Sequence, residues 1–137
     1  MNFSKTAQYA IRVLFYLDRY SEKSHSVNIL HQELNLPYKY LTKLMTELVK
    51  KGLVEASRGR GGGFSLAKDS NKILLYDILE AVGEPLVEGQ CILGFEKCDS
   101  LNPCALHDSW TKPQKLIEDM IATTTLKSLV FEKDTKL

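Results

Sequence analysis

The sequence predicts a mainly α-helical protein with a small β wing: a winged helix-turn-helix domain followed by a long C-terminal dimerisation helix. Three observations support this fold class: two amphipathic helical patterns around a proline break, a hairpin rich in glycine and arginine, and a long apolar stripe near the C-terminus. The 137 residues, 44% hydrophobic and 26% charged, have the size and composition of one folded domain.

The first helix is predicted to begin after Ser4, because a serine hydroxyl can accept a hydrogen bond from the first turn. The pattern turns polar over residues 18–24, where the helix is expected to end. Its apolar positions recur three and four residues apart, at Ala7, Ala10, Leu14 and Leu17.

A second helix is expected over residues 27–33 and a third from about Pro37 to Gly52. The residue before a proline avoids helical backbone, so Leu36 predicts the break between them. The third helix has an apolar face and a basic, polar face, which is typical of a recognition helix lying in the major groove, although a plain helical hairpin shares the pattern. The predicted DNA contacts on it are Pro37, Tyr38, Lys39, Tyr40, Thr42 and Lys43.

Two strand-like runs, residues 53–56 and 64–67, flank a glycine-rich tip and predict a wing. Arg58, Gly59 and Arg60 are the predicted DNA contacts, because arginines on a glycine-rich backbone can reach phosphates or a minor groove. No Lys-Ser or Lys-Thr pair follows the glycines, which argues against a nucleotide-binding loop. A merely flexible turn is the alternative.

Charge divides unevenly along the chain. Residues 1–72 contain 12 basic and 6 acidic residues, whereas residues 73–137 contain 6 basic and 11 acidic residues. A basic half of this kind is expected of a surface that neutralises DNA phosphates.

A fourth helix is expected over residues 74–82, before a loop and a final helical pattern in which Pro113 should produce a kink. The predicted organisation is a DNA-binding domain (1–83), a cysteine-containing loop (84–104), and a dimerisation helix whose C-terminal segment packs back on the first helix (105–137). The apolar stripe continues through Leu126, Leu129 and Val130, too long for the rest of the chain to cover, so a two-fold homodimer is expected, with burial within one chain as the alternative. Its predicted interface residues are Leu106, Trp110, Ile117, Met120 and Ile121.

Four soft metal ligands, Cys91, Cys98, Cys104 and His107, fall within seventeen residues. Their spacing is compatible with an iron-sulfur cluster, with a zinc site lacking the usual close cysteine pairs, or with unrelated thiols. An odd number of cysteines without a secretion signal favours reduced thiols and a cytoplasmic location. His25 and His31 are predicted to be surface residues.

Neither an enzyme nor a membrane protein is indicated. No catalytic triad, paired catalytic carboxylates or cofactor motif is present, so no small-molecule substrate is expected. The longest apolar stretch, residues 10–17, contains Arg12 and is far shorter than a membrane span of about 20 residues.

Short motifs in a fixed order run through nearly the whole chain. They are Tyr9-Ala10 with Leu14 and Leu17, Tyr40-Leu41, Lys51-Gly52-Leu53-Val54, Arg58-Gly59 with Gly61-Gly62-Gly63-Phe64, Asp77-Ile78 with Glu80-Ala81-Val82, Trp110, and Thr125-Leu126 with Leu129-Val130. As a set they resemble the Rrf-type family of bacterial winged-helix regulators. The resemblance implies a dimeric repressor or activator of promoter DNA, with a repressor favoured. In the metal-sensing branches of the family it also implies an iron-sulfur cluster held by three loop cysteines, which match Cys91, Cys98 and Cys104.

The resemblance also bears on the cluster type. In one branch a histidine three residues after the third cysteine completes a 2Fe-2S site, and His107 occupies that position. In another an acidic residue of the first helix completes a 4Fe-4S site, where this chain has Gln8. A 2Fe-2S cluster is therefore favoured over 4Fe-4S, sensing iron-sulfur status, redox state, oxygen or nitric oxide. The alternatives are a cluster-free, zinc- or thiol-sensing regulator of this fold and a small iron-sulfur redox protein.

Overall fold

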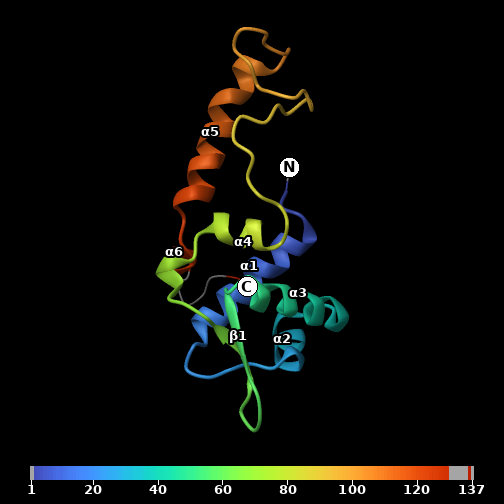
Figure 1. Cartoon of the computed structure of the whole chain (residues 1–137), viewed down its shortest axis with the longest axis vertical. Helices are drawn as coiled ribbons and strands as arrows, with labels where there is room; N and C mark the ends of the chain where they lie inside the picture. The colour runs from blue at the N-terminus through green and yellow to red at the C-terminus, as the bar shows by residue number, and fades with distance from the viewer. Residues whose placement is uncertain (1, 130–135, 137) are drawn as a thin grey trace.

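The computed structural model of the chain describes residues 2–129 and residue 136. Val130, the last residue of the predicted apolar stripe, lies outside these described residues. Helices and a small hairpin form a rounded head at one end of the molecule, and a long helix with its neighbouring loop projects from it (Figure 1). We call residues 2–83 together with α6 the head, and residues 84–123 the arm.

The chain order confirms the predicted mainly helical fold with a small wing. In sequence the elements are α1 (Lys5–Arg19), α2 (Val27–Leu34), α3 (Tyr38–Lys50), β1 (Val54–Ser57), β2 (Gly63–Leu66), the short 3-10 helix η1 (Ser70–Lys72), α4 (Leu75–Ala81), α5 (His107–Thr123) and α6 (Leu126–Leu129).

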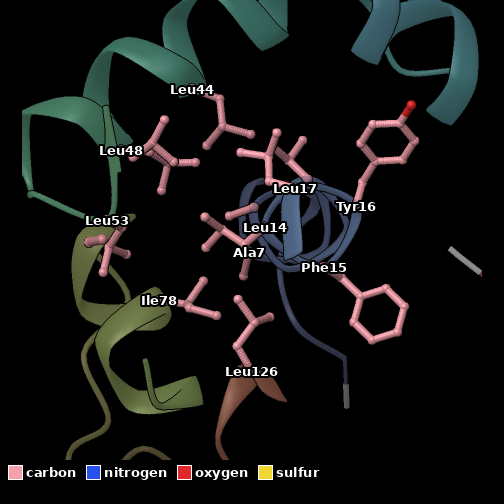
Figure 2. Close-up of a cluster of buried hydrophobic side chains, with 14 of the residues drawn as sticks. Ala7, Leu14, Phe15, Tyr16, Leu17, Leu44, Leu48, Leu53, Ile78 and Leu126 are labelled. Atoms are coloured by element: carbon pink, nitrogen blue, oxygen red, sulfur yellow. The ribbon is translucent and has the colours of Figure 1, made fainter. Parts of the chain in front are cut away.

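Helix α1 is the centre of the head. Ser4 caps it by accepting a hydrogen bond from the Ala7 backbone N–H at 3.2 Å, as the sequence predicted. Figure 2 shows Leu14 and Leu17 of α1 facing Leu44 and Leu48 of α3, with leucine and isoleucine side chains of α4 and α6 closing the core below. The four apolar α1 positions predicted from the sequence are all buried. The apolar face of α3 is buried as well, through Leu41, Leu44, Met45 and Leu48.

The turn between α2 and α3 has a defined backbone geometry. Asn35 ends α2 in the left-handed conformation, with φ 53°, a region that asparagine tolerates better than most residues. The Arg12 guanidinium of α1 donates a hydrogen bond to the Leu34 carbonyl at 2.8 Å. His31 reaches the Leu36 carbonyl through Nδ1. These contacts fix the angle at which α3 leaves the turn.

The wing is an antiparallel pair in which Val54 lies opposite Leu66 and Ser57 opposite Gly63. Its base is joined to the segment before α2, because His25 and Phe64 exchange two backbone hydrogen bonds of 2.9 and 2.8 Å. The prediction that His25 is a surface residue is wrong: only 3% of it is exposed. Its ring packs edge-on against Tyr16 and lies 2.8 Å from the Tyr20 carbonyl through Nε2.

The arm is joined to the head through backbone hydrogen bonds. Leu75 N–H donates to the Thr124 carbonyl, and Leu126 N–H donates to the Ile73 carbonyl. Extended backbone at Thr124 separates α5 from α6, so the predicted apolar stripe is divided between two helices. Because α6 packs beside α1, Leu126 is fully buried in the head. Pro113 lies inside α5, as expected from the sequence.

Candidate nucleic-acid interface and cysteine pocket

The outer face of α3 presents basic and polar side chains to solvent. Lys39, Thr42 and Lys43 are exposed, and 51% of Tyr38 is exposed at the start of the helix. The Thr42 hydroxyl donates to the Tyr38 carbonyl at 3.1 Å, which leaves its oxygen lone pairs facing outward as acceptors. Pro37, the N-cap residue, is exposed beside them. All six predicted α3 contacts, including Tyr40 at 38% exposure, therefore lie at the surface.

Tyr40 differs from the other predicted contacts on α3. Its hydroxyl is hydrogen bonded to the Thr6 hydroxyl, and its ring packs edge-on against Tyr9 with a centroid separation of 5.3 Å. The side chain therefore leans toward α1 and joins α3 to it. Tyr40 is therefore better placed to position α3 against α1 than to contact a DNA base.

The wing tip exposes Arg58 and Arg60 on either side of Gly59, whose φ of 92° is rarely adopted by other residues. At the wing base, Gly63 has φ 147° and approaches the His25 backbone so closely that a Cβ atom would lie 2.5 Å from the His25 carbonyl carbon. Gly63 thus permits the bridge that holds the wing, a role that the sequence pattern did not reveal.

The cations of these two elements are available to phosphates. Within the part of the chain that the structure describes, the one ion pair is Lys115–Asp119 on α5. The lysines of α3 and the arginines of the wing therefore form no ion pair with another described residue. They belong to the basic half of the chain. Unpaired cations on adjacent elements are what phosphate neutralisation requires.

The three cysteines and His107 line one pocket of about 500 Å³ at the far end of the arm. The ligand atoms meet in two pairs: Cys91 Sγ lies 3.8 Å from Cys104 Sγ, and Cys98 Sγ lies 3.3 Å from His107 Nδ1. Cys91 is buried, whereas Cys98, Cys104 and His107 are half-buried. All four sequence-predicted ligands therefore face the same cavity.

The thiols of the pocket do not have equal acidity. Burial acts to raise the pKa of Cys91, but hydrogen bonds from the Leu93 and Phe95 backbone N–H groups outweigh it and lower that pKa. For Cys98, burial and the neighbouring Cys91 and Cys104 sulfurs raise the pKa. The backbone around Cys91 is therefore arranged to favour a thiolate, the form that binds metals.

The pairwise arrangement of the ligand atoms can be compared with the geometry that a metal group requires. Among the described residues, no three His, Cys, Asp or Glu side chains converge on a point where one metal ion could bind. A cluster of two irons instead needs two protein ligands on each iron. Two sulfur ligands about 2.3 Å from one tetrahedral metal lie about 3.8 Å apart, which is the Cys91–Cys104 separation. The residues present fit a two-iron cluster.

Two side chains of α5, both 8% exposed, hold the cysteine loop in place. Glu118 accepts a hydrogen bond from the Gly89 N–H at 3.0 Å, and Gln114 donates to the Gln90 carbonyl at 2.7 Å. The Gly89 carbonyl in turn accepts from the Cys98 N–H at 3.0 Å. The burial of these two polar side chains could not be read from the sequence.

The predicted dimer-interface residues divide between two faces of α5. Leu106 and Met120 are exposed at 42% and 46%, while Trp110 and Ile117 are half-buried beside the loop. Ile121 is 3% exposed and packs into the core of its own chain, so it is not available to a partner in this structure. Leu116, 67% exposed on the same side as Met120, was missed because it lies outside the predicted stripe.

No helix among the described residues combines the length and apolarity that a bilayer-spanning segment requires.

A helix-turn-helix with a basic outer face, an arginine-tipped wing and a distant sensor-like pocket together define a winged-helix regulator of transcription. The chain belongs to the Rrf2 family, described as "Iron-dependent Transcriptional regulator", which matches residues 3–132. Its relatives are regulators and not enzymes, which confirms that expectation.

Three relatives illustrate the similarity. A protein of Aquifex aeolicus named for a helix-turn-helix transcriptional regulator is 36% identical over 132 residues, which cover 95% of this chain and 92% of that protein. The regulator IscR of Pectobacterium atrosepticum is 28% identical, with 98% of this chain and 82% of IscR covered. The structure of CymR, the global cysteine regulator of B. subtilis, superimposes with a TM-score of 0.76 at 26% identity, covering 95% of this chain and 96% of CymR.

Proposed function

We propose that this protein is a cytoplasmic, homodimeric regulator, acting mainly as a repressor, whose affinity for promoter DNA is controlled by an iron-sulfur cluster. Cys91, Cys98, Cys104 and His107 would hold the cluster, with 2Fe-2S favoured over 4Fe-4S. The observation that supports it best is the meeting of these four side chains as two pairs in one pocket. The family description and the similarity to IscR are consistent with it.

DNA binding in this proposal uses the exposed face of α3 and the wing. Lys39, Thr42 and Lys43 would enter the major groove, with Pro37 and Tyr38 at the helix start, while Arg58, Gly59 and Arg60 contact the backbone or minor groove. Tyr40 would act through α1, to which it is bonded.

The chain's own residues can connect the pocket to the DNA surface. Loss, oxidation or nitrosylation of the bound cluster would change the charge and bonding inside the pocket, which is the chemistry that the cluster supplies. Glu118 and Gln114 hold the loop on α5, and the backbone bonds at Leu75 and Leu126 join the base of α5 to the head. A shift of α5 would therefore reorient one head relative to its partner's, changing the fit of two recognition helices to one site.

Dimerisation would use the exposed apolar side of α5. Leu106, Leu116 and Met120 lie on it, whereas Trp110 and Ile117 face the loop. An exposed apolar stripe along a projecting helix is the surface that a second copy can bury in an isologous contact. Sedimentation analysis of the wild type and of Leu116→Glu tests this, and a dimer that persists in the variant would remove this side of α5 from the interface.

The first experiment is anaerobic purification followed by absorbance spectroscopy and a count of iron and acid-labile sulfide per chain. About two of each support the 2Fe-2S proposal, and about four would require a different ligand set. DNA duplexes selected from a random pool then serve as binding targets. The reconstituted protein and the apo form should differ in their affinity for these duplexes. Unchanged DNA affinity after replacing all three cysteines with alanine, under every redox condition, would contradict cluster control.

The wing is tested separately by salt dependence. Arg58→Ala and Arg60→Ala should each weaken DNA binding and reduce the log-log salt slope by about one unit, because each arginine neutralises about one phosphate. Lys112→Ala, an exposed cation on the arm, is the matched control and should leave the slope unchanged. An unchanged slope in both arginine variants removes the wing from the interface.

A further inference from the structure

The two pairs in the pocket also bear on the state in which no cluster is bound. Cys91 and Cys104 meet sulfur to sulfur at 3.8 Å, which is van der Waals contact, whereas Cys98 is turned toward the imidazole of His107. All three cysteines are free thiols in this structure. The geometry therefore singles out one of the three possible cysteine pairs as the pair in contact.

We infer that the cluster-free protein has a thiol-oxidation site, in which a peroxide converts Cys91 and Cys104 into an intramolecular disulfide and leaves Cys98 as a thiol. This inference goes beyond the proposed cluster, because it concerns the same sulfurs when iron is absent. It does not require the cluster proposal to be correct.

The placement of the two sulfurs gives each a role. Cys104 is half-buried, at the start of the segment that leads into α5, and the pocket is open to small oxidants. Cys91 is 5% exposed, so a peroxide reaches it less easily than Cys104. Exposure therefore makes Cys104 the sulfur that a peroxide meets first, and Cys91 lies in contact with it and can resolve the oxidised form.

The reaction balances with a peroxide as the two-electron oxidant. The Cys104 thiolate attacks one peroxide oxygen, the O–O bond breaks, and the leaving hydroxide takes a proton to become water, which leaves Cys104 as a sulfenic acid. The Cys91 sulfur then attacks the Cys104 sulfur, the S–O bond breaks, and a second water leaves. The two thiols lose two electrons and two protons in total.

Closing the bond requires the sulfurs to approach from 3.8 Å to about 2.05 Å. The chain between them permits this movement, because it contains Gly94 in a left-handed conformation and few buried side chains. Cys98 is instead held beside His107 Nδ1, and its backbone N–H donates to the Gly89 carbonyl. The loop thus favours one pairing.

The disulfide and the cluster exclude each other, because both need the same two sulfurs. An oxidised chain should take up no iron and sulfide until a thiol reductant opens the bond. The pocket would therefore report two different conditions through one pair of residues: the supply of clusters and the presence of peroxide.

The test uses full-length apo protein, reduced and then treated with a small excess of hydrogen peroxide. The expected product is monomeric in its covalent mass, about 2 Da lighter than the reduced chain, and has one cysteine open to alkylation. Cleavage after Lys97 separates Cys91 from a peptide that contains both Cys98 and Cys104, and a second digest cut before Asp99 separates Cys104 from a peptide that contains both Cys91 and Cys98. A Cys91–Cys104 bond joins two peptides in both digests, whereas a bond that contains Cys98 joins two peptides in only one of them. Tandem mass spectrometry should find the alkyl group on Cys98.

Variants provide the matched controls. Cys98→Ser should still form the bond, whereas Cys91→Ser and Cys104→Ser should not form it within the chain. A bond that contains Cys98 in the wild type, a bond between chains, or three thiols that all remain reduced would each overturn the inference. Circular dichroism of every variant checks that it is folded.

Failure here is distinguishable from failure of the proposed function. The disulfide is read by mass, without DNA or iron. If the bond forms but anaerobic reconstitution of the reduced protein yields no iron and sulfide, the cluster proposal fails and the thiol site stands. If reconstitution succeeds but Cys91 and Cys104 never join, the reverse holds.

Discussion

The head and the arm of this protein are stabilised by different kinds of contact. The head buries a continuous set of leucine, isoleucine and valine side chains around α1 (Figure 2). The arm contributes few residues to that core, and its loop is held on α5 by hydrogen bonds to Glu118 and Gln114. Large apolar side chains that the head would bury stay exposed on the arm: Val87, Leu93, Phe95, Leu101 and Leu116.

Under the proposed function, this difference would allow one chain both to read DNA and to respond to a signal. The hydrophobic core holds the helices of the head in one rigid arrangement, because densely packed side chains tolerate little displacement. A loop held by a few hydrogen bonds opens at low cost, so its conformation can depend on what fills the neighbouring pocket. In the proposed function, the arm would carry out sensing and the head would carry out DNA recognition.

The largest effect is expected from a cavity in the head. Leu48→Ala removes a fully buried side chain between α3 and α1 and should lower the free energy of unfolding by about 2–5 kcal/mol. Leu116→Ala, on the exposed side of α5, should change it by less than about 0.5 kcal/mol. Urea denaturation of both variants measures the comparison. Equal losses would mean that the arm is as tightly packed as the head.

The next effect is expected at the base of the wing. Gly63→Ala forces a Cβ against the His25 backbone at a positive φ, so we expect a loss of about 2–3 kcal/mol and much weaker DNA binding. Gly61→Ala, also at positive φ but in open space, should cost only about 1 kcal/mol. Thermal melts and DNA titration compare the two. If both glycine variants behave alike, the close contact with His25 has no energetic role.

A smaller, local effect is expected where the loop meets α5. Glu118→Ala removes the acceptor for the Gly89 N–H and should weaken loop docking by about 1–2 kcal/mol. Amide hydrogen exchange at Gly89 and Cys98 should then speed up about tenfold while amides of the head keep their protection. Asp119→Ala, its exposed neighbour, is the control. Faster exchange throughout the head would show that loop and head open as one unit.

The smallest effect concerns the surface of the arm. The hydrogen bond and charge of Asp119, 3.1 Å away, raise the pKa of Lys115. A folded pKa above the unfolded value of about 10.4 means that the pair stabilises the fold at neutral pH and that this contribution is lost as the pH rises through the folded pKa. Melting temperatures of Lys115→Met and wild type should therefore differ slightly at neutral pH and converge in strong alkali. A difference that grows with pH would contradict the ion pair.

Sequence patterns predicted the head better than the arm for a physical reason. The helical periodicity of the buried leucines in α1 and α3 indicates which face of each helix is apolar. The backbone turns are indicated by Asn35, Pro37 and the glycines. His25 was misjudged because its burial depends on Tyr16 and on a backbone bridge to Phe64, which no local pattern records.

The ligand set of the pocket was predictable from residue type, whereas its pairing was not. Cysteine and histidine within seventeen residues indicate a metal or redox site. Which sulfur faces which partner depends on the fold of the loop, and that fold depends on Glu118 and Gln114, polar residues whose burial the sequence does not show. Ile121 was predicted to lie in the dimer interface because its helical spacing matched the apolar stripe, but it is buried in the core of its own chain.

The bridge between His25 and Phe64 has a consequence for the shape of the DNA that this protein prefers. Two backbone hydrogen bonds tie the wing to the segment that leads into α2, so the separation between the recognition helix and the wing tip is set by the protein. A duplex must then present its two grooves at that separation, and duplexes differ in groove width and bending stiffness according to their sequence. Base pairs that neither element touches should therefore influence affinity through the flexibility of the double helix.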